Sequence, residues 1–108
     1  MSRSRRQDFS VRLRAATVGA TVEAAAGRPE DAVRILEETI TSAKKSGYAG
    51  YLLEAQLALG EVEAASGKAT AGRSLLREVQ SQAKLKGFRL IADKAARTSA
   101  KSATAQTK

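Results

Sequence analysis

The chain has 108 residues, which is room for one domain, and apolar residues make up 43% of it while aromatic residues make up only 4%. Because much of the apolar share is alanine, which buries little area per residue, we expect a thin helical assembly without a deep core. The sequence contains neither cysteine nor histidine. Disulfides and thiolate metal sites are therefore excluded, and the commonest general base and metal ligand are missing. We expect no enzyme, no metal, no cofactor and no small-molecule substrate.

The net charge of +8 is unevenly distributed along the chain. Residues 1–14 carry a net charge of +4 and residues 84–108 carry +6, whereas residues 15–83 carry −2. A compact nucleic-acid-binding domain would instead gather its cations on one folded face. No apolar run approaches the roughly 18–20 residues of a membrane span, and no hydrophobic segment follows the basic start. We therefore expect no membrane partner, no secretory signal and a cytoplasmic location.

A basic segment, residues 1–8, precedes the first predicted helix, which starts at residue 9. Two apolar stripes run along this helix at helical spacing, and a helix with two such seams is expected to lie between neighbours on both sides. The stripes are Val11, Ala15, Val18, Val22 and Ala25, and Phe9, Leu13, Thr17, Ala20 and Ala24. Gly27 is the expected left-handed cap at the end of the helix.

The second predicted helix begins at Pro29 and ends at Gly47. Proline suits the first helical position, and Glu30 and Asp31 favour the positive N-terminal end of the helix dipole. Two lysines just before the glycine suit the negative end. The positions predicted to be buried are Ala32, Ile35, Leu36, Thr39, Ile40 and Ala43.

The same plan then recurs, because residues 11–48 align with residues 51–88 at a shift of 40 without a gap, and about a dozen of the 38 pairs are identical. This internal repeat predicts a second helix hairpin built like the first. Its apolar positions and turn glycines are Leu52, Ala55, Leu59, Val62 and Gly67, then Gly72, Leu76, Val79, Ala83 and Gly87. Ala95 continues the column of Ala15 and Ala55, which predicts a closing helix over residues 88–97. Residues 98–108 have no large apolar side chain and are expected to be disordered.

The second copy carries a resemblance to a known family. Leu59 and Gly60, then Gly67, then Leu76 stand at the Leu-Gly, turn-Gly and large-apolar spacing of tetratricopeptide repeats. Over residues 9–97 the chain resembles the longer, degenerate form of this repeat found in regulatory arrays of bacterial transcription activators and signalling kinases. It departs from the usual pattern in its period, which is 40 instead of about 34 residues. Glu23 and Glu63 stand at a position that is usually aromatic, and Gly19 and Ala20 stand where Leu-Gly would be expected. Neither copy ends in a proline.

This resemblance implies an all-α fold of two antiparallel helix hairpins plus a closing helix, arranged as a short right-handed α-solenoid. Repeat 1 would span about residues 9–47 and repeat 2 about residues 48–87. The resemblance also implies a regulatory protein–protein interaction module, and it leaves open that the chain is the C-terminal part of a larger regulator. Such proteins bind a protein or peptide on the concave wall formed by the first helix of each repeat. By position, the wall residues here would be Arg14, Thr17, Thr21, Glu54, Leu57 and Glu61. These lack the Lys/Asn set with which some relatives clamp a C-terminal carboxylate.

Three alternatives stay open. The six wall residues are equally explained as solvated helix faces. The basic ends could attract nucleic acid or another anionic surface, although no aromatic platform for base stacking accompanies them, so nucleic acid is not the expected partner. Two and a half repeats also leave open ends that could pair with another copy, giving a homo-oligomer or a purely structural self-association module.

The remaining conspicuous side chains fit structural roles. The pairs Glu37/Glu38 and Glu61/Glu63 are so close along the sequence that their members point different ways on a helix, and they are expected to be solvated. Tyr48 aligns with Phe88 at the repeat junction, and its neighbour Tyr51 aligns with Val11 and Ile91. We therefore expect both tyrosines to pack and not to bind a ligand.

Overall fold

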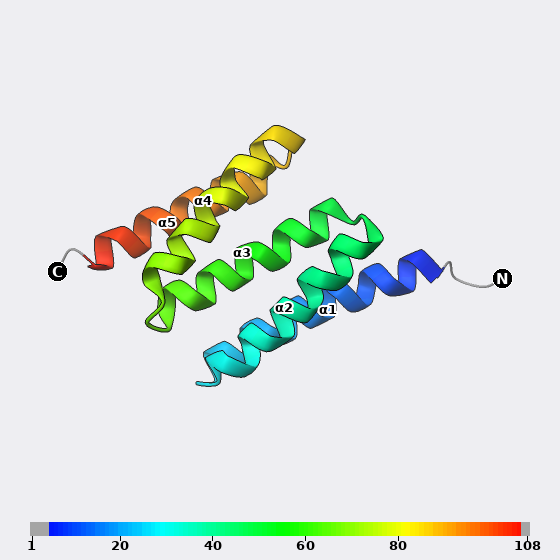
Figure 1. Ribbon diagram of the computed structural model, residues 1–108, viewed down its shortest axis with the longest axis horizontal. Coiled ribbons are helices and arrows are strands. Elements are labelled where there is room, and N and C mark those ends of the chain that lie inside the picture. The colour runs from blue at the N-terminus through cyan, green and yellow to red at the C-terminus, as the bar shows by residue number, and fades with distance from the viewer. Residues whose placement is uncertain (1–4, 107–108) are drawn as a thin grey trace.

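The computed structural model of the chain describes the backbone of residues 5–106 and the side chains of residues 8–101. Five helices follow one another along this part of the chain: α1 (Arg5–Ala25), α2 (Pro29–Ser46), α3 (Ala49–Ala65), α4 (Ala69–Lys86) and α5 (Arg89–Gln106). Residues 5–106 contain no strand. As Figure 1 shows, α1 and α2 form one antiparallel hairpin, α3 and α4 form a second, and α5 packs against the second hairpin. The predicted all-α architecture of two hairpins and a closing helix is confirmed.

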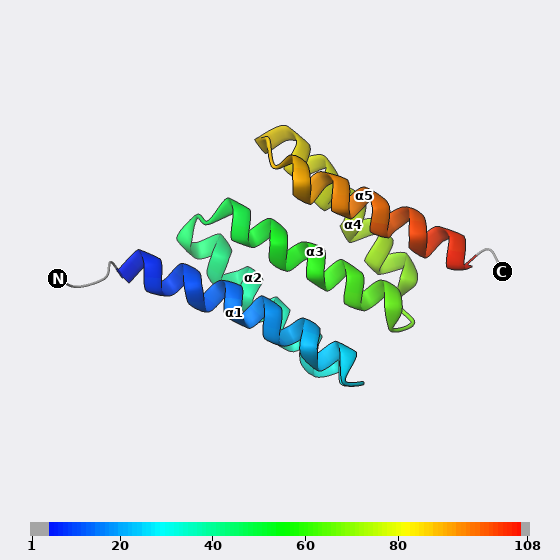
Figure 2. The same ribbon diagram turned by 180° about the vertical axis from the view of Figure 1, so that it is seen from behind.

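The helices form two layers. α1, α3 and α5 lie side by side on one face, whereas α2 and α4 lie on the other, as the two opposite views in Figures 1 and 2 show. The slab that results is thin and elongated, with extents of 57 × 32 × 18 Å. α3 is the central helix, because it packs against all four others.

Each of the four interhelical turns contains a glycine with positive φ: Gly27 at 88°, Gly47 at 73°, Gly67 at 94° and Gly87 at 83°. After the glycine, the next backbone N–H donates to a carbonyl in the last turn of the helix, as from Arg28 to Glu23 at 2.9 Å and from Phe88 to Ala83 at 2.8 Å. This is the Schellman arrangement, which satisfies carbonyls left unpaired at a helix end. The predicted glycine caps are confirmed. Because these glycines are evenly spaced along the chain, successive helices have nearly equal lengths.

Two equivalent leucines anchor the core. Leu36 lies in a cluster that joins α1, α2 and α3, and Leu76 lies in a cluster that joins α3, α4 and α5. The two leucines occupy the same position in successive repeats, and both side chains are fully buried. Burying a leucine side chain contributes about 1.5–3 kcal/mol, so this pair stabilises the two hairpins in the same way.

The second hairpin is the more closely packed, because α3 and α4 meet at two glycines. A Cβ on Gly72 would lie 2.5 Å from the backbone N of Ala64, and a Cβ on Gly60 would lie 2.9 Å from Cδ2 of Leu76. Glycine at position 60 thus admits the facing helix, and Leu76 fills the space beside it. At the corresponding positions of the first hairpin the chain has alanines, and both are fully buried.

Aromatic side chains pack at the junction between the two repeats. The ring centroids of Phe9 and Tyr48 are 5.7 Å apart, and those of Tyr48 and Tyr51 are 5.9 Å apart with the rings edge to face. These distances are typical of aromatic pairs that stabilise a contact. The expectation that both tyrosines pack is met, with α1, the α2–α3 turn and α3 joined by the three rings.

The helices extend beyond the predicted limits at both ends. α1 begins at Arg5, inside the predicted basic segment 1–8, of which residues 1–4 lie outside the described chain. α5 continues to Gln106, so residues 98–106 are helical where disorder was predicted; residues 107–108 lie outside the described chain. No glycine or proline follows Gly87, and extending an existing helix through alanine, lysine and glutamine requires no new nucleus.

Only one of the two predicted stripes of α1 is covered. Leu13 and Ala20 are buried, as expected, and α1 packs against α2 and α3. Val11, Val18 and Val22, from the other stripe, are exposed. The expectation that α1 has neighbours on both sides is therefore wrong for the described chain.

Candidate functional site

An open groove of about 400 Å³ runs along the face formed by the first helix of each repeat and by α5. All six wall residues predicted from the sequence line it: Arg14, Thr17, Thr21, Glu54, Leu57 and Glu61. The other lining residues are Val18, Ala58, Leu90, Ile91 and Lys94. The structure thus brings the predicted residues together in one place, on α1 and α3, and adds α5 as a third wall.

The floor of the groove is apolar. Leu57 and Ala58 are buried in α3, and Ile91 of α5 is half-buried beside them. Leu57 also belongs to the core cluster around Leu76, so it supports the fold as well as the floor. A partner could therefore contact its surface, but a substitution at Leu57 would disturb folding and binding together.

The two threonines of α1 are already engaged with their own helix. The Thr17 hydroxyl donates to the Leu13 carbonyl at 3.1 Å, and the Thr21 hydroxyl donates to the Val18 carbonyl at 2.7 Å. Each hydroxyl has a single proton, so these side chains can offer a partner an acceptor oxygen and a methyl group. Thr17 and Thr21 would therefore contact a partner through their shape and their acceptor oxygens, and they would not donate hydrogen bonds to it.

Charged groups of both signs surround the floor. Arg14 and Lys94 are exposed, on α1 and α5, whereas Glu54 and Glu61 are half-buried on α3. The Thr98 hydroxyl donates to Oε2 of Glu61 at 3.3 Å and so connects α5 to α3 beside the groove. The groove therefore offers cations on its two outer helices and carboxylates on the central one.

The contribution of α5 was missed in the sequence. Leu90, Ile91 and Lys94 line the groove, and Leu90 is one of the most exposed leucines of the described chain, at 85%. A signal was present, because one repeat shift takes Arg14 to Glu54 and a second takes Glu54 to Lys94. Extending the repeat register through the third copy would have identified Lys94 as a wall residue.

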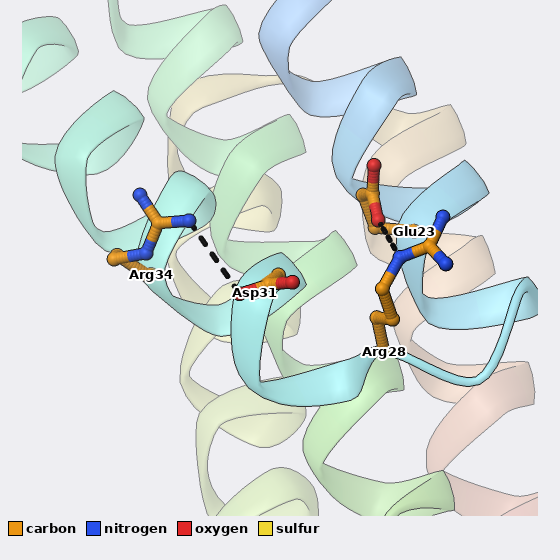
Figure 3. A network of polar contacts seen from close by, with 4 residues as sticks. All are labelled: Glu23, Arg28, Asp31 and Arg34. Atoms are coloured by element: carbon orange, nitrogen blue, oxygen red, sulfur yellow. Dashed lines mark hydrogen bonds and ion pairs between the residues drawn. The ribbon is translucent and has the colours of Figure 1, made fainter.

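The polar contacts at the α1–α2 turn, drawn in Figure 3, involve none of the residues that line this groove. The Arg28 Nε donates to Glu23 Oε1, and this hydrogen bond raises the pKa of the guanidinium. One turn into α2, the Arg34 Nη2 lies 3.5 Å from Asp31 Oδ1. All four side chains sit at the surface, where such pairs contribute little stability, so they accompany the turn and do not form a site.

Within the side chains that the structure describes, no group of three or more Asp, Glu, His or Cys residues is arranged to hold a metal ion. None of the helices in residues 5–106 has the length and apolar character needed to cross a membrane. Glu37 and Glu38 are exposed on α2, as expected of solvated positions, whereas Glu61 and Glu63, for which the same was expected, are half-buried on α3.

Comparisons with protein-family models, with curated proteins and with solved structures find no match to this chain. The tetratricopeptide resemblance therefore depends on the residues of the chain and on its internal repeat, and function has to be argued from the groove itself.

Proposed function

We propose that this chain is a protein–protein interaction module of the tetratricopeptide type, which binds a peptide segment or protein surface in the groove between α1, α3 and α5. One observation carries the proposal. The six positions that the tetratricopeptide resemblance implies as a binding wall all line a single groove, which also has an apolar floor. If these six residues were merely solvated parts of helix faces, nothing would require them to lie together in one groove.

The chemistry of the groove specifies the partner. Its floor suits an apolar side chain lying against Ala58 and Ile91, with the exposed Leu90 beside it. Cations on α1 and α5, on either side of the carboxylates of α3, suit a segment that alternates charge, with acidic groups toward Arg14 or Lys94 and a basic group toward Glu54. A segment with one apolar anchor and charges of both signs meets these requirements.

Binding without catalysis is part of the proposal. The sequence has no histidine or cysteine to act as a base or nucleophile, and the repeat architecture accounts for the buried residues without reference to a reaction. The regulatory role that the resemblance implies and the cytoplasmic location expected from the sequence accompany this proposal.

Selection of a random peptide library on the intact protein tests the proposal. Peptides that bind in the groove should lose about tenfold in affinity to Glu54→Lys, because a rim charge pair is replaced by repulsion. Glu37→Lys, the same change at an exposed position of α2, is the matched control and should leave affinity unchanged. If no peptide is enriched, or if both variants bind equally well, the groove is not the binding site.

The C-terminal charge favours one second candidate, an anionic surface. Lys84, Lys86, Arg89, Lys94, Arg97 and Lys101 are all exposed on α4 and α5. If they bind phosphate groups, affinity for a DNA oligonucleotide should fall linearly with salt on a double-logarithmic plot and should fall further in Lys94→Glu. If DNA does not bind while library peptides still do, the protein-binding proposal is favoured instead.

A further inference from the structure

An exposed apolar stripe runs along the outer side of α1. We define the valine stripe as Val11, Ala15, Val18 and Val22, whose three valines are 58%, 56% and 60% exposed. It lies opposite Leu13 and Ala20, through which α1 packs against the rest of the slab. Scattered exposed apolar residues are ordinary, whereas three valines on one side of one helix mark a contact surface.

The repeat shows what kind of element covers such a surface. One repeat shift takes Ala15, Val18, Gly19 and Val22 to Ala55, Ala58, Leu59 and Val62. These four residues of α3 are buried, and they belong to the core cluster that includes Ala20, Ala32 and Leu36 of the first hairpin. The valine stripe is therefore the α1 counterpart of the α3 surface that packs against the preceding hairpin.

The glycine of α1 supports the same conclusion. Gly19 lies inside the helix, where glycine is a poorer helix former than alanine, and a Cβ there would meet no atom within 4 Å. Gly60 and Gly72 each admit a facing helix, but nothing in the described chain faces Gly19. Beside the valine stripe, its small size allows a close helix approach.

The other end of the slab does not provide a matching surface. Leu53 and Leu57 of α3 pack forward on the second hairpin, and the residues one repeat later, on α5, are Asp93 and Arg97, both exposed. Copies stacked head to tail would place these charges against valines, at a large desolvation cost. The complement of the valine stripe must therefore be apolar, as the stripe itself is.

We infer that the valine stripe binds the valine stripe of a second copy, in a two-fold dimer with the two α1 helices antiparallel. The pattern has the required symmetry: reversing α1 about the point between residues 16 and 17 exchanges Val11 with Val22 and Ala15 with Val18. A two-fold interface uses the same patch on both copies, so each valine meets an apolar residue of the partner.

Charge selects the antiparallel direction. Arg12 and Arg14 are exposed on the first half of α1, and the carboxylate of that helix nearest its C-terminal end is Glu23. Parallel helices would align each arginine with its own copy. In the antiparallel pair the arginines of one copy lie toward the half of the partner helix that carries Glu23, and the two Arg12 residues are about 13 Å apart along the axis.

Sedimentation equilibrium of the intact chain over a wide concentration range tests the dimer. One helix pair buries less than a standard interface, so we expect a dissociation constant of about 10 µM. Val22→Glu should weaken the dimer about 100-fold, because the two-fold axis repeats the change. Leu85→Glu is the matched control, since Leu85 is an exposed leucine on α4, and it should dimerise normally. Circular dichroism should show equal helix content, because neither side chain is part of the core.

The absence of cysteine from the sequence allows a second, independent measurement. Along the axis of an antiparallel pair, Ala15 and its counterpart are about 4.5 Å apart, whereas the two Val11 residues are about 16 Å apart. Under mild oxidation Ala15→Cys should form an intermolecular disulfide and Val11→Cys should not. In a parallel pair both would cross-link.

Several outcomes would overturn the inference: a monomer at every concentration, growth into longer polymers, a dimer whose dissociation constant is unchanged by Val22→Glu, or efficient cross-linking through Val11→Cys alone. Neither Val11 nor Val22 lines the groove, so these results are separate from those of the peptide-binding test.

Discussion

Replacing Gly72 by alanine should destabilise the chain, although alanine is the better helix former. Helix propensity alone would favour the alanine by up to about 1 kcal/mol. The new Cβ, however, would lie 2.5 Å from the backbone N of Ala64 and 2.7 Å from the carbonyl O of Gly60. Both are backbone atoms, so no side-chain rotation relieves the overlap and α3 must move away from α4. Overpacking of this kind costs about 1–3 kcal/mol, and rigid neighbours place it near the upper end, so we expect a net loss of about 2 kcal/mol.

The same substitution at Gly19 provides the control. Gly19 lies within α1, and a Cβ there meets no atom within 4 Å, so only the gain in helix propensity remains, about 1 kcal/mol. Because Gly19 borders the proposed dimer surface, both variants are made in the Val22→Glu background, which we expect to be monomeric. The two alanine variants should then differ by about 3 kcal/mol in their free energies of unfolding, with opposite signs relative to their parent.

Urea unfolding followed by far-ultraviolet circular dichroism measures the difference. With a slope of about 1 kcal/mol/M, expected for a chain of this size, the midpoint of Gly72→Ala should fall by about 2 M and that of Gly19→Ala should rise by about 1 M. If Gly72→Ala is as stable as its parent, the backbones of α3 and α4 do not approach each other as closely as the structure shows. The explanation of the second hairpin would then be refuted.

Two further substitutions test the core and the turns. Leu36→Ala should cost about 3 kcal/mol in unfolding free energy, because Leu36 is fully buried, whereas Leu85→Ala, at an exposed position, should change it by less than about 0.5 kcal/mol; calorimetry or urea titration distinguishes them. Gly87→Ala should cost about 1–2 kcal/mol, because φ is 83° at this cap and alanine is strained there. An unchanged melting temperature for Gly87→Ala would contradict the cap geometry.

Most of the fold follows from the repeat. The repeat register identifies Leu36 and Leu76 as equivalent core positions, and the structure buries both completely. The evenly spaced turn glycines predict where each helix ends, because only glycine adopts the left-handed conformation of these caps without strain. These features were predictable because they depend on local chemistry and on periodicity, and a single sequence is enough to identify both.

The covering of α1 was not predictable in the same way. An apolar stripe at helical spacing shows that a surface can pack, but it does not show that the chain supplies a neighbour. Val18 and Ala58 occupy the same repeat position, yet Ala58 is buried and Val18 is exposed, because only α3 has a preceding hairpin in the described chain. The length of α5 was underestimated for a related reason: low apolar content removes packing, but it does not end a helix that lacks glycine or proline.

The groove was predictable in part. Residues of α1 and α3 were found because both repeats are complete enough to align, whereas Leu90 and Lys94 were missed because the third copy had been aligned only at Ile91 and Ala95. The identity of a partner stays beyond the sequence, since repeat scaffolds fix where a ligand lies and leave its choice to exposed side chains.

The groove and the valine stripe are neighbouring surfaces of α1 that share Val18. Thr17 and Thr21 border the groove, whereas Val11 and Val22 lie on the outer stripe, so substitutions can separate the two. If both proposals hold, a dimer presents two grooves related by the two-fold axis, and a partner that carries two binding segments gains avidity without any new contact. Self-association would then act as a means of strengthening weak peptide binding, and it would be a function in its own right only if the groove proved to bind nothing.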